Sequence, residues 1–360
     1  MQYDLFLTRL VQKVEKYLPR LIYSSHSIEL SQYEIETLWP IWINDYTKLK
    51  AWTDKNAYQR RLALGRKYIF PVIGSLKPSC VTTRNVVSCL ELALSTTNQT
   101  HRKVLIALSQ FLKWCASKDL LDPYKRLPTD VELIEPFLGI RFRKQGGHHP
   151  AIDWREMPYF VSLLIQEKTI SSKALLFIIL TASRLQSVTH AHWDEINFSL
   201  NEWQIPAQHM KGKQGNNRPH EVPLSRQALM LLQSIRNDYS RGEELIFSAT
   251  GNKLSGSSLR KIIRKIDQKS VDLCDHSFRD STQNNRVVVT HGFRASFATW
   301  AQEMGADMSV VEFCLAHSDS NDRHNGAYRR SRMINQRRQL LQDWADFCFS
   351  QESTDHRAKL

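Results

Sequence analysis

The chain has 360 residues, of which 42% are hydrophobic and 24% charged, so it can bury a core and does not resemble a disordered chain. The formal net charge of +13 and an isoelectric point near 9.5 favour a polyanionic partner, with nucleic acid first, although basic surfaces also serve membranes and acidic proteins. The first residues, MQYDLFLTRL, lack the apolar stretch of a signal peptide, and the densest apolar run, 174–180, is too short to cross a bilayer. We therefore expect a cytoplasmic protein of two or three domains.

Six cysteines are scattered along the chain, and none forms a Cys-x-x-Cys pair. This distribution is typical of ordinary thiols in a reducing compartment, and it argues against a disulfide framework or a zinc site. We therefore expect no metal ion and no other cofactor.

The N-terminal part is predicted to be helical. Residues 1–30 should hold one helix, and residues 31–121 should form an almost wholly helical domain. Ser31 and Glu34 have the spacing of a capping box, which predicts that a helix starts there. Basic residues lie on the outer faces of these helices, which suits either nucleic-acid binding or a solvated surface. Positions 98–118 have a strong helical period, with one side formed by Val104, Leu105, Leu108, Phe111, Leu112 and Cys115.

Residues 122–150 are punctuated by four prolines and contain the basic stretch FRKQGGHHP, which predicts an interdomain linker. A second domain, 151–360, opens at Asp153 with Glu156, again the spacing of a capping box, and helices should continue to about residue 190. The runs EWQIPAQ and RPHEVPLS, joined by HMKGKQGNN, predict a β-hairpin, and ELIFSA predicts another short strand. Helices should return from Ser255 to the end. The predicted fold class is mainly α with a small antiparallel β-sheet.

Four stretches place basic side chains in unusual settings. Arg184 follows the apolar run LLFIILTAS, so packing should hold its guanidinium rigidly, unless it only extends from a helix end to solvent. Lys211 lies where the first strand meets the hairpin turn, with Lys213 as a competing choice. Within THGFRASFATW, His291 and Arg294 are three residues apart on one helix face, and Thr290 is expected to cap that helix.

The fourth stretch is CLAHSDSNDRHNGAYRRSRMINQRR. It contains His317 and, 11 residues later, Tyr328, the last tyrosine of the chain. Positions 323–338 hold six arginines and no acids. A basic nucleic-acid-binding tail with an incidental tyrosine is therefore the simpler interpretation of this stretch alone.

The order of these groups is more specific than any one of them. Along the chain they run as an arginine, a hairpin lysine, His-x-x-Arg, a histidine and a late tyrosine. This order is the arrangement of tyrosine recombinases, the phage integrase family, which the chain resembles over about residues 31–350. Five stretches are similar to phrases in integrases of satellite prophages and genomic islands: HHPAIDWREMP, WQIPAQHMK, RPHEVPLS, THGFRASFATWA and RRQLLQDWADF. The resemblance implies a helical core-DNA-binding domain at 31–121 and a mixed α/β catalytic domain at 151–360.

The resemblance also implies roles for six residues. Arg184 and Arg294 would grip the scissile phosphate, with His317 as a further donor. Tyr328 would be the nucleophile that forms a 3′-phosphotyrosyl ester, His291 its base, and Lys211 the proton donor to the departing 5′-oxygen.

The implied partners are double-stranded DNA attachment sites and further copies of the chain, as a tetramer on DNA, with room for DNA-bending accessory proteins and a nucleoid-associated location. Two features depart from the family. Ser187 stands where an acidic residue is common, and residues 1–30 do not show the usual arm-binding module, which is shortened or replaced. A type IB topoisomerase and a non-catalytic DNA-binding protein on the same fold are the alternatives.

Overall fold

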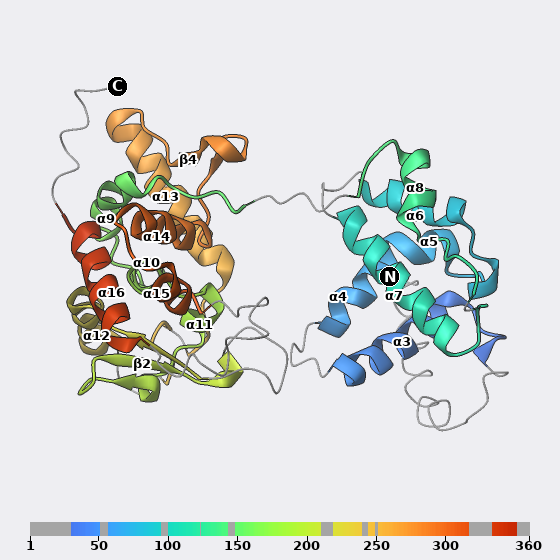
Figure 1. Cartoon of the computed structure of the whole chain (residues 1–360), viewed down its shortest axis with the longest axis horizontal. Coiled ribbons are helices and arrows are strands. Elements are labelled where there is room, and N and C mark those ends of the chain that lie inside the picture. The colour runs from blue at the N-terminus through green and yellow to red at the C-terminus, as the bar shows by residue number, and fades with distance from the viewer. Residues whose placement is uncertain are drawn as a thin grey trace. The chain divides into compact units, whose positions relative to one another are not determined.

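The computed structural model describes residues 30–50, 57–94, 100–122, 124–142, 148–209, 219–239, 244–248, 251–316 and 333–350. The chain divides into two compact units, Met1–Gln145 and Gly146–Leu360, and the colours of Figure 1 distinguish them. The described part is mainly helical with small antiparallel sheets, so the predicted fold class is confirmed. None of the described helices is both long and apolar enough to cross a membrane.

The first unit is a helical bundle around aromatic side chains. Trp39 lies fully buried, with its ring centroid 4.6 Å from that of Trp42 and 4.9 Å from that of Phe111. Large aromatic rings bury much apolar area each, and they join the helices that carry them. The helices of this unit are α3 (Ile35–Lys50), α4 (Ala57–Leu64), α5 (Phe70–Ile73), α6 (Thr83–Leu94), α7 (Thr100–Ser117) and α8 (Val131–Leu138).

The helix that Ser31 was expected to cap begins three residues later than predicted. Leu30 and Tyr33 form a turn instead, and α3 begins at Ile35. The amide of Ile35 donates to Leu76 at 2.9 Å, and the amide of Glu36 donates to Gly74 at 3.0 Å. Backbone groups distant in sequence therefore satisfy the first donors of α3, which is the task that a capping box would otherwise perform.

The period at 98–118 is confirmed, because all six predicted apolar residues of α7 are buried. The segment 122–150, predicted as a linker, contains a helix. Asp130 caps α8 by accepting from the Glu132 amide at 3.1 Å, and Gly139 ends it with a φ of 62°. Ile134 of α8 is fully buried in the core of the first unit. The boundary between the units falls after α8, at Gln145.

The second unit combines helices with two small sheets. Asp153 accepts from the Arg155 amide at 2.9 Å and caps a short 3₁₀ turn that leads into the first helix. The helices are α9 (Met157–Leu164), α10 (Ile170–Thr181), α11 (Leu185–Thr189), α12 (Arg226–Tyr239), α13 (Gly256–Cys274), α14 (Gly292–Glu303), α15 (Met308–Cys314) and α16 (Ile334–Cys348). The strands are β1 (Ile196–Asn197), β2 (Glu202–Ile205), β3 (His220–Pro223), β4 (Arg279–Asp280) and β5 (Arg286–Val287).

Helix α10 is the centre of this unit. Nearly all of its side chains are buried, and it contacts α9, α11, α12, α13, α14 and α16 (Figure 1). A helix that is apolar all round is stable only when other elements surround it. The end of α10 is consequently a fixed point, and the chain leaves it through Ala182 towards Arg184.

The predicted hairpin is confirmed in its strands. β2 and β3 pair antiparallel with Trp203 opposite Val222, and β1 pairs with β2 on the other side. The strand predicted for ELIFSA is wrong, because Leu245 forms only an isolated bridge to His192 within the described residues. The short β4–β5 pair was not predicted, since its strands have two residues each.

Helix α16 packs on its own unit, beside α10, α12 and α15 and against β3. Trp344 is fully buried, and its indole N–H donates to the Ile179 carbonyl at 2.9 Å. The ring lies 5.1 Å from the ring of Trp300 and 5.6 Å from that of Phe297. The C-terminal helix is therefore part of the core of the second unit.

We expect Trp344→Ala to lower the free energy of unfolding of the second unit by about 3–5 kcal/mol, because it opens a cavity against α10. Gln336→Ala, at an exposed position of the same helix, should change it by less than about 0.5 kcal/mol. Chemical denaturation monitored by tryptophan fluorescence and circular dichroism measures both. Equal effects of the two substitutions would contradict the packing of α16.

Candidate active site

Arg184 lies at the junction between the central helix and α11, where it is half-buried. Ala182, two residues earlier, has a φ of 47°, in the left-handed region that residues other than glycine rarely adopt. This turn ends α10 and directs the guanidinium of Arg184 to the end of α15, where Nη2 donates to the Ala316 carbonyl at 2.9 Å. The expectation that packing holds Arg184 rigidly agrees with this contact.

Arg294 lies in the first turn of α14 and is only 4% exposed. Its Nη1 donates to the Ala182 carbonyl, and its Nη2 donates to the Leu315 carbonyl at 2.6 Å. The structure therefore brings Arg184 and Arg294 together, although 110 positions of sequence separate them. The two guanidiniums meet between the C-terminal ends of α10 and α15. Helix C-termini carry partial negative charge, which favours cations there.

His220 on β3 extends this arrangement. Its ring hydrogen-bonds to the Cys314 backbone, so three consecutive residues at the end of α15 each contact one basic side chain. His220 contacts Cys314, Arg294 contacts Leu315, and Arg184 contacts Ala316. Ala316 also has a φ of 47°, so the chain turns sharply where these contacts occur.

Arg337 on α16 completes the cluster. It is 2% exposed and donates through Nη2 to the Glu221 carbonyl of β3, and the same atom lies 3.4 Å from Nε2 of His220. Neither His220 nor Arg337 was predicted as a site residue from the sequence. The only available signals were that RPHEVPLS and RRQLLQDWADF are phrases shared with the family that the chain resembles.

The electrostatics of the cluster follow from burial and like charge. Burial, together with the nearby charge of Arg184, lowers the pKa of Arg294 to about 9, which leaves it protonated at neutral pH. Burial also lowers the pKa of Arg184 and of Arg337. Burial first, and then the charges of the three arginines, lower the pKa of His220 to about 3, so its ring is neutral at physiological pH. A phosphate placed among these groups would relieve the repulsion between them.

The remaining predicted residues divide into two groups. His291 is exposed, and its ring lies 4.6 Å from that of His149, while Arg294 one turn later is buried. The expected cap at Thr290 is wrong, because α14 begins at Gly292 and His291 occupies the N-cap position. Three predicted residues lie outside the described part of the chain: Lys211, His317 and Tyr328.

Ser187, which stands where the family often has an acid, is 4% exposed. Its hydroxyl donates to the His209 carbonyl at 3.3 Å. The ring of His209 in turn donates to Glu195 at 2.8 Å, and Glu195 also accepts from the Trp203 indole at 2.8 Å. Ser187 and Glu195 thus hold His209, which precedes Lys211 by two positions.

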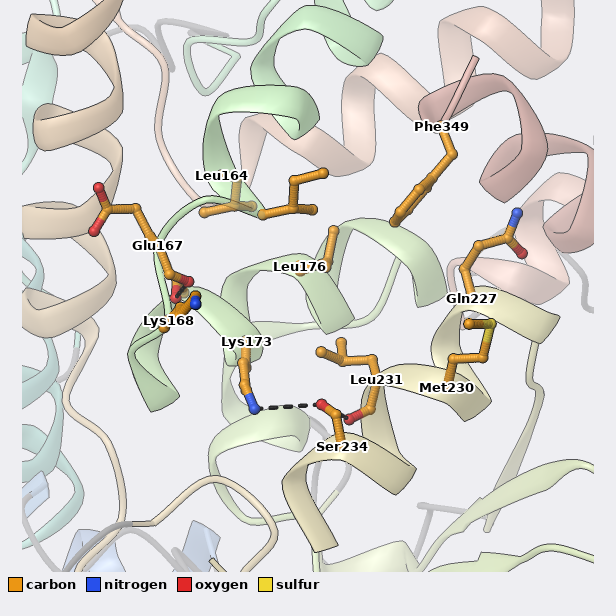
Figure 2. A pocket seen from close by; sticks show the side chains of 12 residues that line it. Leu164, Glu167, Lys168, Lys173, Leu176, Gln227, Met230, Leu231, Ser234 and Phe349 are labelled. Carbon is orange, nitrogen blue, oxygen red and sulfur yellow. Dashed lines mark hydrogen bonds between the residues drawn. The ribbon is translucent and has the colours of Figure 1, made fainter. Parts of the chain in front are cut away.

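A separate surface pocket of about 380 Å³ lies between α9, α10 and α12. Figure 2 shows Leu176, Leu231 and Phe349 at this pocket, and a dashed line joins Lys173 to Ser234. The amino group of Lys173 donates to the Ser234 hydroxyl at 3.3 Å. Its lining is mainly apolar and includes neither Arg184 nor Arg294. Among the described residues, no group of three or more His, Cys, Asp or Glu side chains is placed to hold a metal ion. The arginine cluster is therefore the better candidate for binding an anion.

The cluster is suited to a tetrahedral oxyanion. Each guanidinium has five N–H donors in a planar fork, a geometry that matches paired phosphate oxygens. Backbone carbonyls orient the arginines without cancelling their charge, so the field of two cations stays available to a phosphate.

Comparison with known proteins gives a consistent picture. Residues 156–333 match the phage integrase family model. The prophage integrases IntZ and IntA of Escherichia coli K12 are 29% and 27% identical, over 83% and 79% of this chain and 68% and 63% of their own lengths. The chain thus spans about two thirds of these relatives. A lambda integrase tetramer bound to a Holliday junction has a similar fold, with a TM-score of 0.58 at 13% identity, over 87% of this chain and 88% of that one.

The low pKa of His220 predicts acid sensitivity. In the unfolded chain its pKa returns to the ordinary value of 6.5, so as the pH falls below 6.5 the unfolded state binds the proton and the folded state does not. The stability contribution is full above pH 6.5 and declines towards pH 3. At pH 5 this costs wild type about 2 kcal/mol relative to pH 7.5.

His220→Asn removes the titrating ring, so the loss of stability between pH 7.5 and pH 5 should be about 2 kcal/mol smaller than in wild type. Urea denaturation at the two pH values measures it. His148→Asn, at an exposed position, serves as the control and should keep the wild-type difference. Identical pH dependence of wild type and His220→Asn would contradict a half-buried ring that stays neutral in the folded chain.

Proposed function

We propose that this chain, which belongs to the phage integrase family of tyrosine recombinases, is a site-specific DNA recombinase that integrates or excises a mobile element. One observation carries the proposal. Arg184 and Arg294, from different helices, converge at the end of α15, directly before His317 in the sequence. The segment that matches the family contains both arginines, and a pair of guanidiniums is suited to the negative charge of a DNA phosphodiester.

The two arginines would grip the scissile phosphate. Attack on a phosphodiester gives a five-coordinate transition state with extra negative charge on its non-bridging oxygens. Planar guanidiniums can donate paired hydrogen bonds to these oxygens, which lysine cannot do. His317, next in sequence to Ala316, would donate one more. Donors that are already in place before reaction each contribute about 10²- to 10³-fold in rate.

Tyr328 would be the nucleophile. Its oxygen attacks the phosphorus and forms a 3′-phosphotyrosyl ester, and the bond to the 5′-oxygen breaks. His291 would accept the phenolic proton, since a free phenol has a pKa of about 10, and Lys211 would protonate the departing oxygen. The 5′-hydroxyl of a partner strand then attacks the ester and restores the tyrosine. The ester conserves the bond energy, so the exchange needs no ATP.

Double-stranded attachment-site DNA and further copies of the chain are the proposed partners. Exposed basic residues lie on helices of both units, including Arg60 and Arg66 of the first and Arg260, Lys261 and Arg264 of the second. Phosphate contacts of this kind dominate DNA affinity and make it fall with salt. Lambda integrase, whose fold is similar, forms a tetramer on a Holliday junction, and we expect the same assembly here.

Tyr328→Phe should abolish covalent capture of DNA, because it removes the attacking oxygen. The substrate is a nicked duplex that carries the attachment core, taken from the direct repeat at the two ends of the element, and the product is detected as a protein–DNA adduct in a denaturing gel. Tyr124→Phe removes a hydroxyl from a side chain that is 95% exposed, and it should form the adduct at the wild-type rate. An undiminished adduct with Tyr328→Phe would overturn the assignment of the nucleophile.

Arg294→Lys should slow adduct formation by about 10²- to 10³-fold at saturating protein, since an ammonium group cannot reproduce the paired hydrogen bonds. Single-turnover cleavage with excess enzyme measures the rate, and a titration with unnicked duplex gives the Kd separately. A rate within about threefold of wild type would remove Arg294 from the proposed phosphate grip.

A further inference from the structure

Strand β3 contacts both elements that flank residues 317–332. On one side, His220 contacts the last residue of α15 through the Cys314 backbone. On the other side, Arg337 from the second turn of α16 donates to the Glu221 carbonyl of the same strand. Two neighbouring residues of one short strand therefore bind the element before this segment and the element after it.

His220 and Arg337 are also in contact with each other. Nη2 of Arg337 lies 3.4 Å from Nε2 of His220, and a guanidinium can only donate, so Nε2 accepts. The other ring nitrogen, Nδ1, then carries the hydrogen and is the one that can donate to the Cys314 backbone. Arg337 thereby selects the tautomer of His220 that binds the end of α15.

Arg337 reaches α15 directly as well. Its guanidinium hydrogen-bonds to the Cys314 thiol, whose pKa burial raises to about 11, so the sulfur is neutral. A buried guanidinium is costly unless several acceptors surround it. With the Glu221 carbonyl, the Cys314 sulfur and the His220 ring around it, Arg337 joins three segments that are distant in sequence.

We propose that His220 and Arg337 are positioning residues of the active site: they fix the end of α15 and, through its carbonyl groups, the two arginines that bind the phosphate. Leu315 and Ala316 directly follow Cys314, and their carbonyls accept from Arg294 and Arg184. Movement of Cys314 would therefore move both guanidiniums together. This inference rests on the proposed function where it predicts an effect on cleavage. Its prediction for phosphate binding does not depend on that function.

The expected effect is on the reaction more than on DNA affinity. Contacts along the duplex would set most of the affinity, whereas the rate depends on where two guanidiniums lie relative to one phosphate. A misplacement of about 1 Å in such a site costs on the order of 10²-fold in rate. Arg337 is too buried to touch DNA itself, so its removal acts only through the groups that it holds.

The test uses the full chain with Arg337→Met, which keeps an unbranched side chain that can stay buried and removes the guanidinium donors. Single-turnover adduct formation should fall about 10- to 100-fold, while the Kd for unnicked duplex should change less than about threefold. Arg338→Met is the matched control. It removes the same charge from the adjacent residue, which is half-exposed and pairs with Glu202 at 2.6 Å on β2, and it should cleave at nearly the wild-type rate.

His220 supplies an independent second pair of variants. His220→Ala should slow cleavage as Arg337→Met does, and His220→Asn should recover part of the rate, because its amide can still donate near the position of Nδ1. These variants decide the matter if Arg337→Met lowers the melting temperature so far that it does not fold. Folded His220→Ala with the wild-type cleavage rate would overturn the inference, as would equal losses with Arg337→Met and Arg338→Met.

Inorganic phosphate gives a readout that does not depend on recombination. At equal ionic strength, phosphate in place of chloride should raise the melting temperature of wild type and Arg338→Met more than that of Arg337→Met, because a ligand of the folded state stabilises it. Absence of any adduct with wild type would reject the proposed recombinase activity and leave this comparison to decide the positioning role. The same phosphate shift in wild type and Arg337→Met would reject that role.

Discussion

The second unit is organised around a buried cation, Arg294, whose guanidinium is held by backbone carbonyls at the ends of two helices. Removing such a charge from water is costly, and hydrogen bonds to carbonyls offset that cost only in part. The partial negative charge at two helix C-termini stabilises the Arg294 guanidinium, while the positive charge of Arg184 repels it. The cluster is thus stable enough to form, and its guanidiniums keep the positive charge that an anion-binding site needs.

The choice of carbonyls as partners has a functional consequence. A carboxylate paired directly with Arg184 or Arg294 would have to be displaced by a phosphate, and its own charge would repel that phosphate. A carbonyl dipole orients the guanidinium without this competition. The charge of Glu312 also acts on Arg294, but it raises the pKa of Arg294 less than burial and Arg184 lower it. The carbonyls therefore orient the two guanidiniums, and they leave each guanidinium positively charged.

The sequence predicted those features that depend on local pattern. The buried face of α7, the apolar run that becomes α10 and the β2–β3 pairing were all visible as periodicity and turn composition. Failures occurred where distant backbone groups decide the outcome. α3 starts at Ile35 because Leu76 and Gly74 accept its first amides, and Leu245 has too few pairing partners among the described residues to form a strand.

The residues of the candidate site also fall into those that the sequence predicted and those that it did not. Arg184 and Arg294 were identified because a family pattern names their positions, and the structure brings them together. His220 and Arg337, by contrast, are 117 positions apart, and neither looks unusual in its own segment. A histidine at a strand start and an arginine in a basic helix are ordinary surface residues by composition. Only the packing of both against the end of α15, with Arg337 buried and His220 half-buried, gives them a role.

Position 187 shows how a missing charge can be supplied from elsewhere. A serine hydroxyl there holds the His209 carbonyl, whereas the negative charge comes from Glu195, which is 9% exposed and binds the His209 ring and the Trp203 indole. The 3₁₀ turn Ala207–His209 after β2 is thereby fixed from two sides, by a neutral donor at the His209 carbonyl and by a carboxylate at the His209 ring. An acidic side chain at position 187 would face the His209 carbonyl with no proton to donate, so serine is the residue that suits this neighbour.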